Sequence, residues 1–173
     1  MKIAWVGVGL GLALVLQTTL APMVAGAGAP VDLVLVVVVA VAVASGPIAG
    51  IWVGTVGGLL QDALSGGVIG VGGLAKTLVG YLVGQFGARF LIVRPWHHLL
   101  VFFLASLVHA GCFIGVYSLL SDGGMMTSYG AVLTQATANA AIGVTVAVGL
   151  QVEPGWLGRR RLRRRSLSRR FGG

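Results

Sequence analysis

Few side chains in this 173-residue sequence could take part in chemistry, because only 9% of its residues are charged. Lys76 is the one basic residue inside a long apolar segment. A charge at the middle of a membrane costs at least about 2.5–3.5 kcal/mol. We therefore expect Lys76 either to meet a partner or a polar cavity, with Asp62 the nearest acidic candidate, or to extend its ammonium group to the membrane interface. The sequence leaves both alternatives open.

His109 and Cys112 lie three residues apart, a spacing that could place two metal ligands on one face of a helix. A structural zinc site needs four ligands, and no further cluster of cysteine and histidine supplies them. We therefore expect no metal. Gln135, Thr137 and Asn139 fall in the last apolar segment, where we expect them to form hydrogen bonds between helices.

No arrangement of residues typical of a catalytic site is found. The four acidic residues are scattered along the chain, and no nucleophile motif or phosphate-binding loop is present. The glycine-rich stretch 7–11 lies in an apolar segment without a preceding strand, so it does not indicate a dinucleotide site. We expect no enzyme activity, no catalytic residues and no cofactor. The candidate functional polar residues are Asp62, Ser65 and Lys76.

The elements that position these residues follow from the composition. Hydrophobic residues make up 57% of the chain, whereas a soluble domain carries about 25% charged residues. So little charge predicts an all-α integral membrane protein, with the bilayer as its main solvent. A span needs roughly 20 residues to cross a hydrocarbon core of about 30 Å. The chain therefore has room for six or seven spans and no second, soluble domain.

The apolar segments predict a six-transmembrane-helix bundle over residues 1–154. The spans are expected at about 3–20, 31–45, 47–64, 68–88, 99–120 and 129–150. No charge occurs from residue 33 to 61, and a single helix of that length would measure about 43 Å. The proline at Ser45-Gly46-Pro47 divides this segment into two short helices. A signal peptide would also fit Lys2 and the first apolar run, but the spans that follow argue against it.

Charge placement favours an even number of spans. Short cytoplasmic loops are enriched in Lys and Arg, so Arg89, Arg94 and the tail at 155–173 belong on the cytoplasmic side. Six spans place Lys2 on that side too. We therefore expect a multi-pass protein of the bacterial cytoplasmic (inner) membrane, with both termini in the cytoplasm and Asp32, Asp62 and Asp122 outside.

The tail carries the whole net charge of +8. A basic run beside a membrane binds anionic lipid at about 1 kcal/mol per residue. We expect it to contact membrane lipid or an acidic cytoplasmic partner, and we expect no nucleic acid. The residues concerned are Arg159, Arg160, Arg161, Arg163, Arg164 and Arg165.

Glycines recur at every fourth position in two of the predicted spans. Small residues at this spacing let helix backbones approach closely in lipid. They could serve either packing within the bundle or docking of a partner's transmembrane helix, and the sequence does not assign the face. The residues are Gly46, Gly50, Gly54, Gly58, Gly72, Gly80 and Gly84.

Three central stretches, together with Leu16-Gln17-Thr18-Thr19-Leu20, resemble the rod shape-determining protein MreD family. They are 46–50 (GPIAG), 58–67 (GLLQDALSGG) and 74–84 (LAKTLVGYLVG), with Gly70 between the last two. The resemblance covers most of the chain and is most specific from about residue 44 to 90. It implies a non-enzymatic scaffold subunit of the cell-elongation complex, which supports peptidoglycan synthesis. The partners implied are a bitopic MreC-like protein, the actin-like filament complex, and the peptidoglycan polymerase and transpeptidase.

The alternative is the substrate-binding subunit of an energy-coupling-factor-type vitamin transporter. Those subunits have six helices and a similar size, and the MreD fold resembles theirs. The first outer connection, 21–30, is short and nearly featureless, which argues against a loop that closes over a ligand. A channel or small-solute transporter would need a polar path, and only Lys76, His109, Gln135 and Asn139 would line it.

Overall fold

The computed structural model describes residues 3–24, 31–66, 68–89, 95–120 and 128–152. Within these ranges the chain forms six α-helices and no strand. The helices are α1 (Ile3–Val24), α2 (Leu33–Ser45), α3 (Pro47–Ser65), α4 (Val71–Arg89), α5 (Pro95–Leu120) and α6 (Tyr129–Val152). Each occupies one of the six predicted ranges, with ends that differ by a few residues. The arginine-rich tail lies outside the described residues.

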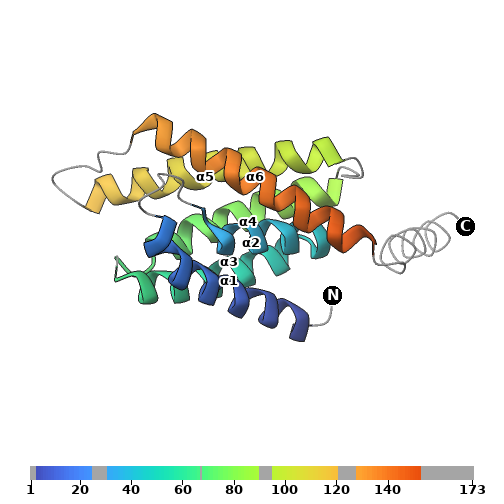
Figure 1. The fold of residues 1–173 in the computed structure, drawn as a ribbon, viewed down its shortest axis with the longest axis horizontal. Helices are drawn as coiled ribbons and strands as arrows, with labels where there is room; N and C mark the ends of the chain where they lie inside the picture. Colours follow the sequence, from blue (N-terminus) through green and yellow to red (C-terminus); the bar gives the residue numbers. More distant parts are fainter. Residues whose placement is uncertain (1–2, 25–30, 67, 90–94, 121–127, 153–173) are drawn as a thin grey trace, which may run out of the picture.

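Successive helices run in alternating directions along one bundle (Figure 1). The start of α1 and the end of α6 therefore lie at the same end of the bundle, and the turn between α3 and α4 lies at the other. Two helices are long and apolar enough to cross a membrane, at Trp96–Leu120 and Tyr129–Gly149. The stretches Ala4–Thr19 and Leu33–Ser45 are apolar but shorter.

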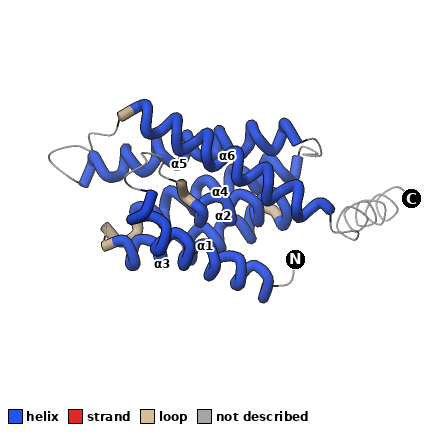
Figure 2. The backbone as a smooth tube through the Cα atoms, in the orientation of Figure 1, coloured by secondary structure: helices blue, strands red, loops and turns tan. Residues whose placement is uncertain are grey.

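The central element is α2, which the other helices surround (Figure 2). Its sequence is almost entirely valine, leucine and alanine, and a helix that is apolar on every side is stable only where every side is covered. Val34 and Val38 are fully buried against Leu10 and Leu14 of α1. On another side, Leu35 and Val39 join a core that includes Phe102 of α5.

The break between α2 and α3 lies at Gly46-Pro47, where the sequence predicts it. Gly46 has φ +93°, a backbone conformation that favours glycine, and its N–H donates to the Ala42 carbonyl (2.9 Å). Pro47 then occupies the first turn of α3, where its missing N–H costs nothing. Gly46 thus serves the turn, and a side chain there would meet open space.

The glycine rows of α3 and α4 face each other inside the bundle. A Cβ atom at Gly50 would collide with the Gly80 carbonyl, and one at Gly54 would lie 2.6 Å from the Lys76 carbonyl oxygen. Gly58 meets Gly73 in the same way. The two backbones are therefore in direct contact, as small residues permit in lipid. These glycines are covered by the chain itself, so they are not free to meet a partner's helix.

Candidate functional site

Two charged side chains and a histidine meet at the buried start of α2. Lys76 of α4 forms an ion pair with Asp32, with 2.8 Å between Nζ and Oδ2. Lys76 is 2% exposed and Asp32 4%. The Nε2 atom of His109 in α5 lies 3.2 Å from the lysine Nζ and 3.9 Å from the same carboxylate oxygen. Three titratable groups from three parts of the chain are thus in mutual contact away from solvent.

Burial of α2 explains why polar groups gather there. The first N–H groups of a helix have no partner within it, and burial removes water as an alternative. Asp32 is the N-cap residue, and its Oδ1 accepts from the Leu35 N–H (2.9 Å). Gln17 of α1 accepts from the Leu33 N–H (2.8 Å) and donates to the Val31 carbonyl (2.6 Å). A carboxylate at this position also complements the positive end of the helix dipole.

A side chain of α6 completes the network. Asn139 is 1% exposed, and its Oδ1 accepts from the Asp32 N–H (2.9 Å). Its Nδ2 donates to the Ser106 hydroxyl of α5 (3.1 Å). We name the set Asp32, Lys76, His109, Asn139 and Ser106 the polar network. It joins the start of α2 to α4, α5 and α6.

The structure corrects the expectation for Lys76. Its ammonium does not reach the interface, because the side chain is enclosed, and its ionic partner is Asp32 and not Asp62. Asp62 instead accepts hydrogen bonds at Oδ2 from the backbone N–H groups of Gly70 (2.9 Å) and Gly73 (3.1 Å). It therefore fastens the start of α4 to the end of α3. Lys76 and Asp62 nevertheless line the same cavity.

That cavity has a volume of about 240 Å³. It lies beside the polar network, between the ends of α3, α4, α5 and α6 that meet near the α3–α4 turn. Asp32 and Lys76 contribute to its lining, as do Gln61, Ser65 and Gln135. All three predicted polar residues, Asp62, Ser65 and Lys76, thus line one cavity.

The other candidate residues from the sequence are the possible metal ligands and the polar side chains of α6. Among the described residues, no group of three or more His, Cys, Asp and Glu side chains is arranged to hold a metal ion. Cys112 is a half-buried free thiol. Asn139 bonds between helices as expected, whereas the Thr137 hydroxyl donates to the Leu133 carbonyl of its own helix (2.8 Å).

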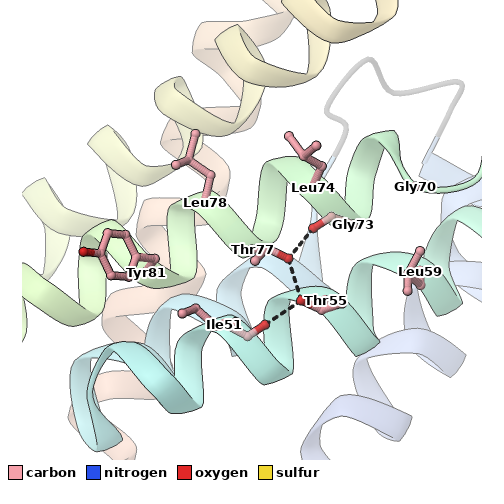
Figure 3. Close-up of a pocket in the computed structure, with 9 residues that line it drawn as sticks. All are labelled: Ile51, Thr55, Leu59, Gly70, Gly73, Leu74, Thr77, Leu78 and Tyr81. Atoms are coloured by element: carbon pink, nitrogen blue, oxygen red, sulfur yellow. Dashed lines mark hydrogen bonds between the residues drawn. The ribbon is translucent and has the colours of Figure 1, made fainter.

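A second feature is an apolar groove on the outer face of α3 and α4 (Figure 3). Its volume is about 590 Å³, and Ile51, Leu74 and Leu78 line its sides. On its floor the Thr55 and Thr77 hydroxyl oxygens lie 2.8 Å apart. Each hydroxyl also lies within hydrogen-bond distance of a carbonyl one turn earlier in its own helix. Because each hydroxyl has one proton, two of these three contacts can be hydrogen bonds at one time. The floor is therefore narrow, its hydroxyl groups have hydrogen-bond partners within the chain, and the walls are apolar.

Comparison with protein families shows which family the chain belongs to. The model of the rod shape-determining protein MreD family matches residues 2–151. The chain belongs to the MreD family. Its members are bacterial membrane proteins with a role in rod shape determination. No curated protein matches this chain, and no solved structure does.

Membership of the MreD family agrees with the resemblance carried by residues 44 to 90. The vitamin-transporter alternative has no support from these comparisons. The match extends over all six helices, so the polar network and the groove both lie within the family region. Sequence reasoning missed Asp32 as a site residue. Its signal was an acidic residue directly before an uninterrupted apolar run, which is the pattern of a helix N-cap.

Proposed function

We propose that this MreD-family protein is a non-enzymatic scaffold subunit of the bacterial cell-elongation complex. On this proposal it crosses the inner membrane six times with both termini in the cytoplasm. The alternating helices support the even count, because they bring the start of α1 and the end of α6 to one end of the bundle. The basic tail would lie at the cytoplasmic surface and contact anionic lipid.

The observation that carries the scaffold proposal is the groove between α3 and α4. A bitopic MreC-like partner presents one transmembrane helix, and helices in lipid associate where their surfaces pack closely. Here the glycine contacts hold α3 and α4 together, while Leu74 (55% exposed) and Leu78 (41% exposed) lie beside the groove. The partner helix would lie along this groove. The peptidoglycan polymerase, the transpeptidase and the actin-like filament complex would bind to the assembly of the two proteins.

Photo-crosslinking in cells tests this placement. A photoreactive amino acid at Leu74 or Leu78 should crosslink to the MreC-like protein. The same residue at Leu104 of α5, which is equally exposed at 55%, should not. Crosslinks from Leu104 with none from Leu74 or Leu78 would place the partner on another face. Affinity purification in mild detergent gives a second measurement, in which recovery of an ATPase module in place of an MreC-like protein would contradict the scaffold.

The six-span topology has its own test. In a background that lacks Cys112, Ser45→Cys places a thiol at the end of α2, just before α3 begins, and Ser65→Cys places one at the end of α3. Neither change disturbs the glycines that follow α2 and α3. An impermeant thiol reagent added outside the cell should label position 65 and leave position 45 unlabelled until the membrane is opened. Labelling of both positions from outside would contradict six spans.

A further inference from the structure

The 240 Å³ cavity beside the polar network has a chemical character that the scaffold role does not use. Its lining contains two carboxylates, Asp32 and Asp62, and one ammonium, Lys76. The lysine is committed to Asp32 at 2.8 Å. Asp62 receives only backbone N–H groups, and none of the described residues forms an ion pair with it. With histidine neutral, the lining therefore carries one uncompensated negative charge.

Two acceptor atoms of the cavity lining have no hydrogen-bond donor among the described residues. Gln61 Oε1 is buried and has no partner among the described residues. Both hydrogen bonds to Asp62 end on Oδ2, which leaves Oδ1 without a donor in the same part of the chain. The Gln61 oxygen is buried, and a buried acceptor without a donor costs about 1–3 kcal/mol. A ligand that carries several N–H donors and a positive charge would satisfy both residues at once.

One wall of the cavity is aromatic. His109, Phe113 and Tyr117 follow one another at four-residue spacing on α5. Their rings are stacked, with centroids 6.0 Å apart for the first pair and 6.1 Å for the second. The faces of aromatic rings attract cations. These aromatic residues line the cavity and are therefore compatible with a positive charge inside it.

The geometry points to a binding site for a primary ammonium group in this cavity. Asp62 supplies the counter-charge, Gln61 Oε1 accepts a hydrogen bond, and aromatic residues of α5 form part of the lining. A water molecule occupies about 30 Å³ in the liquid, so the cavity has room for an aminoalkyl group of a few heavy atoms. A free small amine and the headgroup of an amine-bearing lipid such as phosphatidylethanolamine share this chemistry.

Calorimetric titration with ethanolamine tests the site. The full-length protein is placed in nanodiscs of phosphatidylcholine alone, which contain no primary amine. Ethanolamine should bind saturably, and ethylene glycol, which has a hydroxyl in place of the ammonium, should not. Equal binding of the two probes, or no binding of ethanolamine, overturns the proposal. Binding of inorganic phosphate in place of ethanolamine overturns it too, because that would assign the cavity to anions through Lys76.

Two variants localise the binding. Asp62→Asn keeps an oxygen that can accept from Gly70 and Gly73, and it should weaken ethanolamine binding by about tenfold or more, as loss of a charge-assisted hydrogen bond does. Gln61→Leu should weaken it less. Gln85→Leu is the matched control, because Gln85 is a partly exposed glutamine of α4 that does not line the cavity, and among the described residues its side chain bonds to Tyr81. Unchanged affinity in both cavity variants, with the apo unfolding temperature preserved, contradicts the assignment.

A second set of nanodiscs distinguishes a lipid headgroup from a free amine as the source of the ammonium group. If the headgroup fills the site, discs that contain phosphatidylethanolamine should abolish the ethanolamine signal of the unmodified protein. If the ligand is a free amine, the signal should remain. Both outcomes support an ammonium site and differ only in its source. Crosslinking of the partner at Leu78 should persist in Asp62→Asn, so failure of the ligand site and failure of the scaffold proposal are separable.

Discussion

Removal of either member of the Asp32–Lys76 pair should destabilise the bundle far more than removal of both. The two charges are 2.8 Å apart, and their side chains are 5% and 3% exposed. Truncation of one partner leaves the other charge buried without compensation, which costs about 3–5 kcal/mol. Lys76→Met and Asp32→Asn should each show a loss of this size, and Asn at position 32 retains the oxygen that caps Leu35.

The double variant, Asp32→Asn with Lys76→Met, shows whether the two charges stabilise each other. It contains no buried charge at these positions, and apolar or neutral replacement of a buried ion pair is often close to neutral. We therefore expect the double variant to be more stable than either single variant, so that its loss falls short of the sum of the two single losses by at least about 3–5 kcal/mol. Unfolding in mixed micelles, followed by circular dichroism as the share of sodium dodecyl sulfate rises, measures all four proteins.

Arg89→Met is the matched control for Lys76→Met. It removes a basic residue from the same helix, but Arg89 lies exposed in the last turn of α4, so its loss should change stability little. If the double variant loses the full sum of the two single losses, the charges do not interact and the account of the polar network is wrong.

Three further predictions concern helix contacts. Gly80→Leu should unfold the protein or strongly lower its unfolding temperature, because its Cβ would collide with Gly50. Gly7→Leu should not, because no atom of the described residues lies within 4 Å of a Cβ built at that position. Circular dichroism on both variants decides this, and equal melting would contradict the α3–α4 contact. Asn139→Leu leaves the buried Asp32 N–H without an acceptor and should cost about 1–3 kcal/mol of stability in the micelle assay. A smaller loss for Asn139→Leu than for Ser106→Ala would refute the placement of Asn139 in the polar network. Phe102→Ala should cost about 3–5 kcal/mol there, since Phe102 is 2% exposed and fills the core against Gly143; an unchanged midpoint would argue against that core.

Hydropathy and proline placement predicted the six helices because each depends on local sequence. Apolar length sets where a helix can lie in lipid, and Gly46-Pro47 ends one helix and begins the next by backbone chemistry alone. The glycine spacing likewise indicated close helix contact. It could not indicate which helices meet, because the same spacing at Gly7 and Gly11 of α1 faces open space.

The partner of Lys76 could not be found in the same way. Proximity in sequence favoured Asp62, which lies on the neighbouring helix and lines the same cavity. The actual partner depends on which helix the others enclose. Enclosure of α2 buries its start, and Asp32 comes with it. The apolar character of α2 on all sides is visible in the sequence, so the demand for capping groups at residue 32 could have been inferred, but not the identity of the groups that meet it.

The two candidate surfaces share one helix. Lys76 directs its side chain into the polar network, and the next residue, Thr77, lies on the floor of the groove. The position of α4 against α3 therefore affects both at once. Asp62 fixes that position through Gly70 and Gly73, and Gly70 and Gly73 also line the groove. Because Asp62→Asn keeps an oxygen that can accept from Gly70 and Gly73, that variant should weaken amine binding and leave partner crosslinking from Leu78 in place. Both should therefore be measured on the same set of variants.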